Sequence, residues 1–271
     1  MDERETRSRV RKDYGSIALN VLQGSPASCC GSSSCCTSTP ISTGLYGQEA
    51  AAVLPQELLT QSLGCGNPLA LEQLQPGEIV LDLGCGGGLD TLLAAHRVGP
   101  SGRAYGLDMT LEMLRLAQRN RDRVGLAQVY FLAGELEALP LASNTIDCVI
   151  SNCVFNLSPN KSKALAEAYR VLKPGGRLAI SDILRLRPIP ERLRQNPQLW
   201  SACLAGAMAV DELQELLAHL GFIDRQVQII RTYQTAELDA IFQAAGLSEQ
   251  DVAEFDGEFF ASAFIRAVKP A

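Results

Sequence analysis

From residue 69 onward, short apolar runs alternate with amphipathic stretches. The runs "EIVLDLG" (78–84), "RAYGLDM" (103–109) and "IDCVISN" (146–152) are separated by segments such as "LEMLRLAQRNRDRVG" (111–125). Short apolar runs that alternate with helical segments predict βαβ units and a parallel sheet. We therefore predict a doubly wound α/β fold with its ligand site at the carboxyl ends of the strands.

The two ends of the chain depart from this pattern. The N-terminal part begins with a charged, helical segment, passes through the Ser/Gly/Cys run "SCCGSSSCCT" (28–37) and ends in the tight loop "CGNP" (65–68). We expect an N-terminal cysteine-bearing appendage, a Rossmann-like domain and a C-terminal α+β extension, over 1–68, 69–185 and 186–271. In the extension we predict a helix from about Ala202 to Leu220 and a closing pair of strands. The segment 232–257 matches no motif, and its role and the oligomeric state stay open.

Charge and composition narrow the class of partner. The net charge is −6 and no Lys/Arg run is sustained, which argues against nucleic-acid binding. The N-terminus lacks the apolar core of a secretory signal, and no stretch is long and apolar enough to cross a membrane. We expect a cytoplasmic protein whose nine cysteines are kept as thiols.

Three strand ends carry polar groups that suit one nucleoside. "VLDLGCGGGLD" places Asp82, Gly84 and Gly86 where the first strand turns into its helix, so the backbone can approach a ligand closely. Asp108 ends the second strand, 20 residues after Gly88, where an acid can accept from both ribose hydroxyls. In "GELEALP", Glu135 can accept from an adenine amino group and the Leu136 amide can donate into the ring.

These motifs resemble the class I S-adenosylmethionine-dependent methyltransferases. "DLGCGGG", "GLDMT", "GELEALP" and "VLKPGGRLAISD" follow that superfamily's motifs in order and spacing. No Lys-Ser/Thr follows the glycines, so a triphosphate-binding loop is excluded, and a dinucleotide oxidoreductase predicts neither Asp82 nor the "KPGG" turn. The resemblance implies S-adenosyl-L-methionine as co-substrate. Its expected binding residues are Asp82, Gly84, Gly86, Asp108, Met109, Glu135 and Leu136, with Asn152 near the methyl-bearing end.

Three isolated cysteines bear on the methyl acceptor. Cys65 lies in "SLGCGNP", Cys153 in "SNCVFNLSPNK" just beyond the fourth strand, and Cys203 in "CLAGAM" at the start of the predicted helix. A buried free cysteine often acts only as a small hydrophobe, which is how we interpret Cys85 and Cys148. With "SCCGSSSCC", however, these motifs look like the arsenite methyltransferase family, over about residues 14–222.

The resemblance implies that Cys65, Cys153 and Cys203 bind trivalent arsenic as thiolates, with Cys36 or Cys35 as the fourth family cysteine. Soft thiolates suit this soft centre, and three of them leave the arsenic lone pair free to attack the methyl carbon. Positioning of this kind accounts for ~7–11 kcal/mol of a barrier. The lone pair carries no proton, so no general base is required, in keeping with only two histidines in the chain.

The N-terminal thiols have a redox interpretation. Returning arsenic to the trivalent state after methylation requires two thiols to form a disulfide, and the resemblance implies Cys36 (or Cys35) with Cys65, reset by thioredoxin or glutathione as thiol reductant. The adjacent pairs lack the C-x₂-C spacing of zinc sites, which disfavours zinc. A plain tail is the simpler alternative.

Two alternative functions stay open at this point. The cysteines are merely packed if the methyl acceptor is a small organic molecule such as a quinone or sterol, and a thiol-rich binding protein would sequester metalloid without turnover. Fold alone does not choose an acceptor. The number of methyl groups added and the preference between inorganic and organic arsenicals are likewise open.

Overall fold

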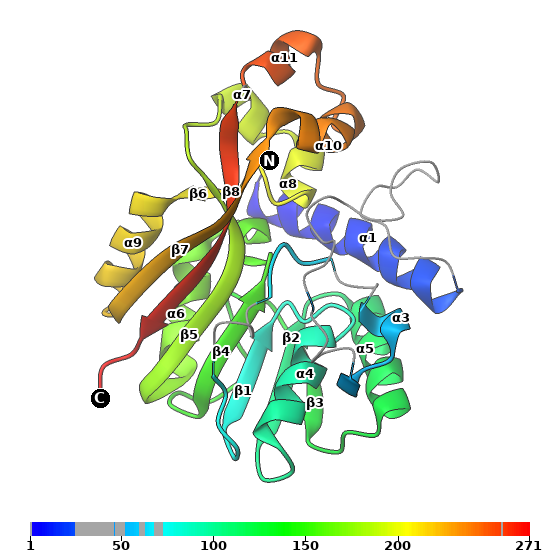
Figure 1. Ribbon diagram of the computed structural model, residues 1–271, viewed down its shortest axis with the longest axis vertical. Helices are drawn as coiled ribbons and strands as arrows, with labels where there is room; N and C mark the ends of the chain where they lie inside the picture. The colour runs from blue at the N-terminus through cyan, green and yellow to red at the C-terminus, as the bar shows by residue number, and fades with distance from the viewer. Residues whose placement is uncertain (1, 25–45, 47–51, 60–62, 68–72, 256) are drawn as a thin grey trace.

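The computed structural model describes residues 2–24, 46, 52–59, 63–67, 73–255 and 257–271. Within these residues one eight-stranded sheet has the order β3-β2-β1-β4-β5-β8-β7, and β6 pairs with β5 (Figure 1). The strands are Ile79–Leu83 (β1), Arg103–Asp108 (β2), Val129–Ala133 (β3), Ile146–Asn152 (β4), Leu172–Arg185 (β5), Met208–Ala209 (β6), Ile223–Gln234 (β7) and Glu258–Val268 (β8). The predicted α/β class is confirmed.

Helices flank this sheet on both sides. The α-helices of the first half are Glu3–Leu22 (α1), Gln56–Leu59 (α3), Leu89–Val98 (α4), Leu111–Val124 (α5) and Lys161–Val171 (α6). Those of the second half are Glu191–Arg194 (α7), Pro197–Ser201 (α8), Val210–His219 (α9), Asp239–Ala244 (α10) and Glu249–Ala253 (α11). Two 3₁₀ turns, Phe155–Leu157 (η1) and Thr235–Leu238 (η2), complete the described elements.

The parallel half of the sheet follows directly from the apolar runs. Val80 of β1 pairs with Ala104 of β2 on one side and with Cys148 of β4 on the other, so β1 is central. A strand covered on both faces is a nearly continuous apolar run, and Leu81 and Leu83 of β1 are fully buried. The carboxyl ends of β1, β2 and β4 therefore meet at one edge, where the glycine turn lies.

Helix α1 begins the N-terminal appendage, whose described residues also include α3, and it packs against the Rossmann-like domain. Asp2 caps it by accepting from the Glu5 amide at 2.7 Å, and Glu5 accepts in return from the Asp2 amide. Ile17, Ala18 and Val21 form a cluster with side chains of α5. This contact holds α1 across the edge where the strands end (Figure 1).

Two predicted boundaries are wrong. The helix expected from about Ala202 begins only at Val210, and Cys203 lies in the turn between α8 and β6. The "KPGG" turn is assigned to β5, where pairing with β4 shifts from Ile146↔Leu172 to Cys148↔Arg177. The turn is therefore an irregularity within β5. Between these two paired positions β5 contains more residues than β4 does, as in a β-bulge.

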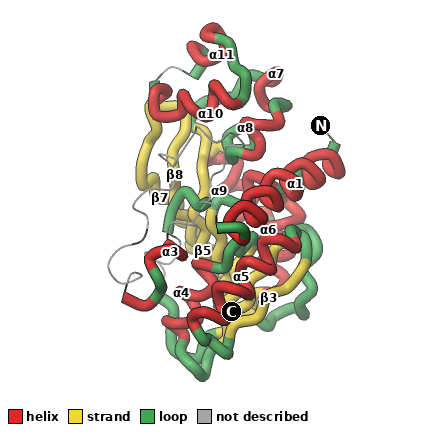
Figure 2. Tube along the Cα trace, turned by 90° about the vertical axis from the view of Figure 1, so that its right-hand side faces the viewer, coloured by secondary structure: helices red, strands yellow, loops and turns green. Residues whose placement is uncertain are grey.

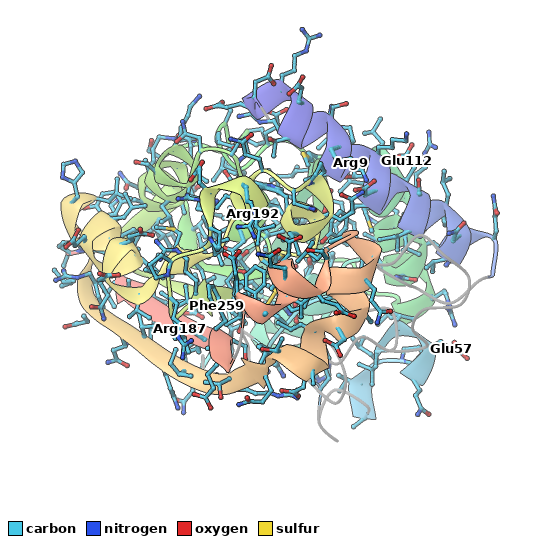
Figure 3. All side chains as sticks on the ribbon, turned by 90° about the horizontal axis from the view of Figure 1, so that it is seen from above. Arg9, Glu57, Glu112, Arg187, Arg192 and Phe259 are labelled. Atoms are coloured by element: carbon cyan, nitrogen blue, oxygen red, sulfur yellow. A yellow bond between two sulfur atoms is a disulfide. The ribbon has the colours of Figure 1, made fainter. Side chains whose placement is uncertain are left out.

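The closing strands of the C-terminal extension are confirmed as β7 and β8, which pair antiparallel to each other, and β8 also pairs antiparallel to β5. The unmatched segment between them forms η2, α10 and α11, which gather with α7 and α8 at one end of the molecule (Figures 1 and 2). Arg192 of α7, which is labelled in Figure 3, donates to Asp251 of α11 at 2.6 Å and also pairs with Glu254. Phe255 stacks on Phe242 at 4.9 Å between ring centroids, so this segment has a packed core.

Candidate active site

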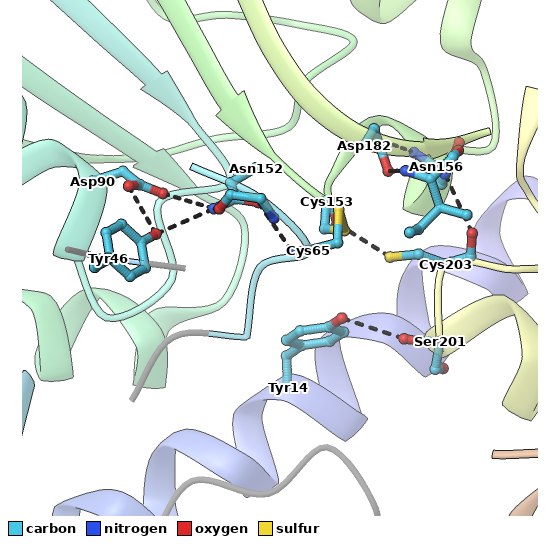
Figure 4. Close-up of a disulfide and its surroundings, with 12 residues drawn as sticks. Tyr14, Tyr46, Cys65, Asp90, Asn152, Cys153, Asn156, Asp182, Ser201 and Cys203 are labelled. Atoms are coloured by element: carbon cyan, nitrogen blue, oxygen red, sulfur yellow. Dashed lines mark hydrogen bonds between the residues drawn. A yellow bond between two sulfur atoms is a disulfide. The ribbon is translucent and has the colours of Figure 1, made fainter. Parts of the chain in front are cut away.

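The structure brings Cys65, Cys153 and Cys203 together (Figure 4). Cys65 and Cys153 form a disulfide across 88 residues of sequence, with a Cα–Cα distance of 5.8 Å. The Cys203 thiol donates to the Cys153 carbonyl at 3.1 Å. All three cysteines are buried. The predicted Cys36, and its alternative Cys35, lie outside the described residues, whereas Cys65 here has Cys153 as its partner.

Two of these cysteines have unusual backbone geometry. Cys153 has a φ of 56° and Cys203 a φ of 64°, and residues other than glycine seldom adopt this left-handed conformation. The Cys153 amide donates to the Ser181 carbonyl at 2.8 Å, and the Cys203 amide donates to the Trp200 carbonyl at 2.9 Å. Such strain persists where surrounding contacts over-determine the backbone, and it gathers at functional sites.

Asn152 connects the cysteine loop to the end of β4. Its Oδ1 accepts from the amides of Cys65 (3.1 Å) and Gly66 (3.2 Å), and its Nδ2 donates to the Gly66 carbonyl at 2.7 Å. The same Nδ2 donates to Asp90 at 3.0 Å and to the Tyr46 hydroxyl at 3.2 Å. Asn152 borders the predicted cofactor pocket, but the hydrogen bonds of its amide orient the Cys65 loop.

Behind the cysteines lies a buried polar network that sequence reasoning missed. Asn156 donates through Nδ2 to Asp182 Oδ1 at 2.8 Å, to the Ile183 carbonyl at 2.6 Å and to the Cys203 carbonyl at 3.2 Å. Burial raises the pKa of Asp182 to about 7, although hydrogen bonds from the Ile183 and Asn156 amides oppose the rise. Burial also lowers the pKa of Lys161 to about 8. The only sequence signal was Asp182 itself, at the end of the matched motif "LAISD".

Beside the cysteines lies a pocket between α1 and the strand ends. Most of the predicted cofactor residues border it, namely Asp82, Gly84, Gly86, Asp108, Met109, Leu136 and Asn152, and so does Cys153. Gly86 has a φ of +50°, and a Cβ built there would meet only Met113 within 4 Å. The backbone at Gly86 is therefore open to the pocket, as close approach of a nucleoside requires.

Hydrogen bonds order the acids of the pocket, of which Asp82 and Asp90 are buried and Asp108 is half-buried. Thr91 donates to Asp82 at 2.6 Å, and Asp108 accepts from the amides of Gly86 (3.0 Å) and Thr110 (2.8 Å). The pKa of Asp82 is raised well above its ordinary value, mainly by burial and next by repulsion from the negative charge of Asp90. Burial also raises the pKa of Asp108. Burial also raises the pKa of Asp90 to about 6, against hydrogen bonds from Asn152 and Tyr46.

Glu135 is placed differently from the prediction. Its carboxylate lies 3.4 Å from Arg7 and 3.4 Å from Arg11, both on α1, and it is absent from the residues that border the pocket. Arg7 also lies 3.6 Å from the buried Glu137, which accepts from Ser158 at 2.5 Å. In this structure Glu135 fastens α1 over the pocket, and its predicted contact with adenine stays a prediction.

The two cysteines interpreted as packing residues are both buried. Cys148 lies in the apolar centre of β4, whereas Cys85 stands in the glycine turn and borders the pocket. Burial raises the pKa of Cys85 well above its ordinary value, which keeps it a neutral thiol. Neither belongs to the disulfide.

Comparison with known proteins agrees with this geometry. Residues 74–246 match a family model described as a methyltransferase domain. The chain is 38% identical over its whole length to an arsenite methyltransferase of Halobacterium salinarum, and 34% identical over 76% of its length to that of Homo sapiens. It covers 68% and 57% of these two relatives, respectively.

A solved structure shows the same relation. CrArsM of Chlamydomonas reinhardtii, an arsenic(III) S-adenosylmethionine methyltransferase, superposes with a TM-score of 0.67 at 35% identity, over 82% of this chain and 73% of its own. The fold and the domain match define a Rossmann-like methyltransferase. Within that class, the chain belongs to the arsenite methyltransferase family. No helix in the described part of the chain has the length and apolar character to cross a membrane.

Proposed function

We propose that this protein transfers a methyl group from S-adenosyl-L-methionine to trivalent arsenic held by Cys65, Cys153 and Cys203, giving methylated arsenicals. The observation that carries the proposal is the convergence of these cysteines, from three distant segments, beside the pocket that Cys153 borders. A reaction between two bound species requires both sites to be adjacent. The names of the relatives, which are arsenite methyltransferases, support the same substrate.

The residue types suit the chemistry. Three thiolates satisfy a pyramidal arsenic centre and leave its lone pair unshared. The lone pair forms the new As–C bond while the methyl–sulfur bond breaks, and the electron pair of that bond stays on the departing sulfur. Arsenic is oxidised by two electrons and no proton moves, so the site requires no general base.

The chain's own residues bind and orient the nucleoside in this proposal. Asp108 offers carboxylate oxygens to the ribose, the open backbone at Gly86 allows close approach, and Leu136 and Met109 border the base. S-adenosyl-L-methionine supplies an electrophilic methyl group when bound. Helix α1 covers the pocket with Val10, Tyr14 and Ile17, which excludes water from the reacting groups.

Arsenic binding requires a thiol reductant in this proposal. Cys65 and Cys153 are joined in this structure, so two electrons and two protons must restore their thiols before either binds arsenic. Thioredoxin or glutathione are the reductants we propose, and a reducing, cytoplasmic compartment is the setting in which such thiols persist. A quinone or sterol acceptor is not favoured, because it gives the three convergent cysteines no role.

Product analysis tests the proposal. Reduced protein is incubated with S-adenosyl-L-methionine and arsenite, beside Cys153→Ser, Cys203→Ser and the matched control Cys148→Ala, which removes a buried thiol outside the site. We expect methylated arsenic from the wild type and the control and none from the two serine variants. If the wild type binds S-adenosyl-L-methionine but yields no methylated arsenic, the proposal is wrong.

A further inference from the structure

Cys65, Cys153 and Asp182 bring two sulfur atoms and a carboxylate oxygen to one buried point. Their ligand atoms lie within 4.8 Å of one another, and all three residues are buried. The two sulfurs are bonded here, and a phosphine or dithiol supplies the two electrons that convert them into thiols. Each thiol, and the Asp182 carboxyl group where it is protonated, then releases its proton to solvent when it binds a cation.

Hydrogen bonds to one of its oxygens fix the Asp182 carboxylate, as is usual for carboxylates that bind metals. Its Oδ1 accepts from the Ile183 amide at 2.8 Å and from Asn156 Nδ2 at 2.8 Å. Its Oδ2 accepts a longer contact from the Asn156 amide, at 3.3 Å, and the Phe155 amide also stabilises the carboxylate. A carboxylate oxygen has two lone pairs, so Oδ2 keeps capacity for a cation. Hydrogen bonds that fix a ligand in this way are the usual outer shell of a metal site.

The charges suit a divalent ion. Two thiolates and one carboxylate carry three negative charges, and the half-buried Lys161, whose positive charge interacts with Asp182, offsets one of them. Its ammonium is held by the Ser158 carbonyl at 3.0 Å and lies 5.0 Å above the Trp200 ring. The remaining two negative charges match a dication, whereas arsenic is already neutralised by three thiolates.

We propose that, once the disulfide is reduced, Cys65, Cys153 and Asp182 bind a divalent thiophilic cation of the zinc type. Zinc accepts thiolate and carboxylate ligands together, and three protein ligands leave one coordination position open. The arsenic set shares Cys65 and Cys153 with this site but takes Cys203 as its third ligand. The two centres therefore exclude each other, and zinc inhibits the protein by occupying two of the arsenic thiolates. The zinc site itself does not depend on methyl transfer.

The binding experiment must exclude the N-terminal thiols, which are zinc ligands in their own right. The full chain is therefore prepared with Cys29, Cys30, Cys35 and Cys36 changed to serine, and reduced with a phosphine, which does not compete for zinc as a dithiol does. Zinc affinity is measured against a chromophoric chelator, and arsenite affinity is measured by loss of titratable thiols. Asp182→Asn and Cys203→Ser are compared with the exposed control Asp122→Asn.

We expect each of the two variants to lose affinity for a different ligand. Asp182→Asn lowers zinc affinity at least ~10-fold and leaves arsenite affinity unchanged, whereas Cys203→Ser abolishes tight arsenite binding and leaves zinc affinity within about twofold. Saturating arsenite displaces zinc from the parent protein. The proposal is overturned if the serine-substituted parent binds no zinc, if Asp182→Asn binds zinc as the parent does, or if Cys203→Ser loses both ligands together. If the serine-substituted parent binds zinc but not arsenite, the result contradicts the proposed function and does not contradict the zinc site.

Discussion

Asn152 fixes Cys65 in place through both sides of its side-chain amide. Its oxygen accepts from the Cys65 and Gly66 amides, and its nitrogen donates back to the Gly66 carbonyl. Gly64 completes the fit, because a Cβ built there would lie 2.2 Å from Asn152 Nδ2. The strand end that carries Cys153 thus also sets the position of Cys65, so the positions of two of the three proposed arsenic ligands are coupled.

We expect Asn152→Ala to weaken arsenite binding by about tenfold. The substitution leaves the loop amides without their acceptor, and such a loss costs about 1–3 kcal/mol. The fluorescence of Trp200, the chain's one tryptophan, is a direct reporter, since the Trp200 carbonyl accepts from the Cys203 amide. Asn20→Ala, on the exposed face of α1, is the control. Unchanged arsenite affinity with lost S-adenosyl-L-methionine affinity would show that Asn152 serves the cofactor alone.

The features that could be predicted from the sequence are those fixed by strand order. Asp82, Gly86 and Asp108 lie at consecutive strand ends, and a parallel sheet brings such ends to one edge whatever the loops do. Cys153 follows from the same rule, because it comes directly after β4. Local signals at strand ends therefore predicted most of the residues that line this pocket.

The features that the sequence did not reveal depend on contacts between distant segments. "CLAGAM" is rich in helix-forming residues, yet Cys203 adopts a left-handed turn, where the Asn156 side chain bonds its carbonyl. Tertiary contacts here outweigh helix propensity. Glu135 likewise follows its strand as predicted, but no pattern in the chain indicates that Arg7 and Arg11 would cover it.

A mutant cycle separates the two roles of Glu135. If it acts only by holding α1, Glu135→Ala raises the KM for S-adenosyl-L-methionine severalfold in the wild type but adds little once Arg7 and Arg11 are alanine. Partly exposed ion pairs contribute about 0.2–1 kcal/mol each, so the effect of the pairs together is modest. A full further loss in the double-alanine background would instead establish a direct contact between Glu135 and adenine. Steady-state kinetics of the four proteins decides between the two.

Disulfide mapping tests the redox cycle. Before turnover and without reductant, we expect mass analysis to find the Cys65–Cys153 bridge of this structure. After reduction, removal of reductant and a single turnover, we expect a bridge from Cys36 or Cys35 to Cys65, as the family resemblance implies. Cys35→Ser and Cys36→Ser identify which thiol pairs. Recovery of only the Cys65–Cys153 bridge after turnover would exclude the N-terminal cysteines from the cycle.

Asp182 should make the folded protein less stable as the pH rises towards neutrality. Burial raises its pKa from 3.8 to about 7, so between these values the folded chain holds a proton that the unfolded chain has released. The contribution of this proton to the free energy of unfolding is therefore fully present below about pH 4. It is lost as the pH rises through about 7. Asp182→Asn stays neutral throughout, and its amide oxygen still accepts from the Ile183 amide.

We therefore expect the free energy of unfolding of Asp182→Asn, relative to wild type, to increase from pH 5 to pH 7.5 by about 2.5 kcal/mol, because each pH unit between the two pKa values contributes about 1.4 kcal/mol. Asp82 and Asp90 titrate in both proteins, so their contributions cancel in the difference. Staying below pH 7.5 also keeps Lys161, whose pKa is about 8, mostly charged. Urea unfolding of reduced protein across this range, with Asp122→Asn as the control, measures the difference. A difference that does not change with pH would mean that Asp182 keeps an ordinary pKa in the folded protein.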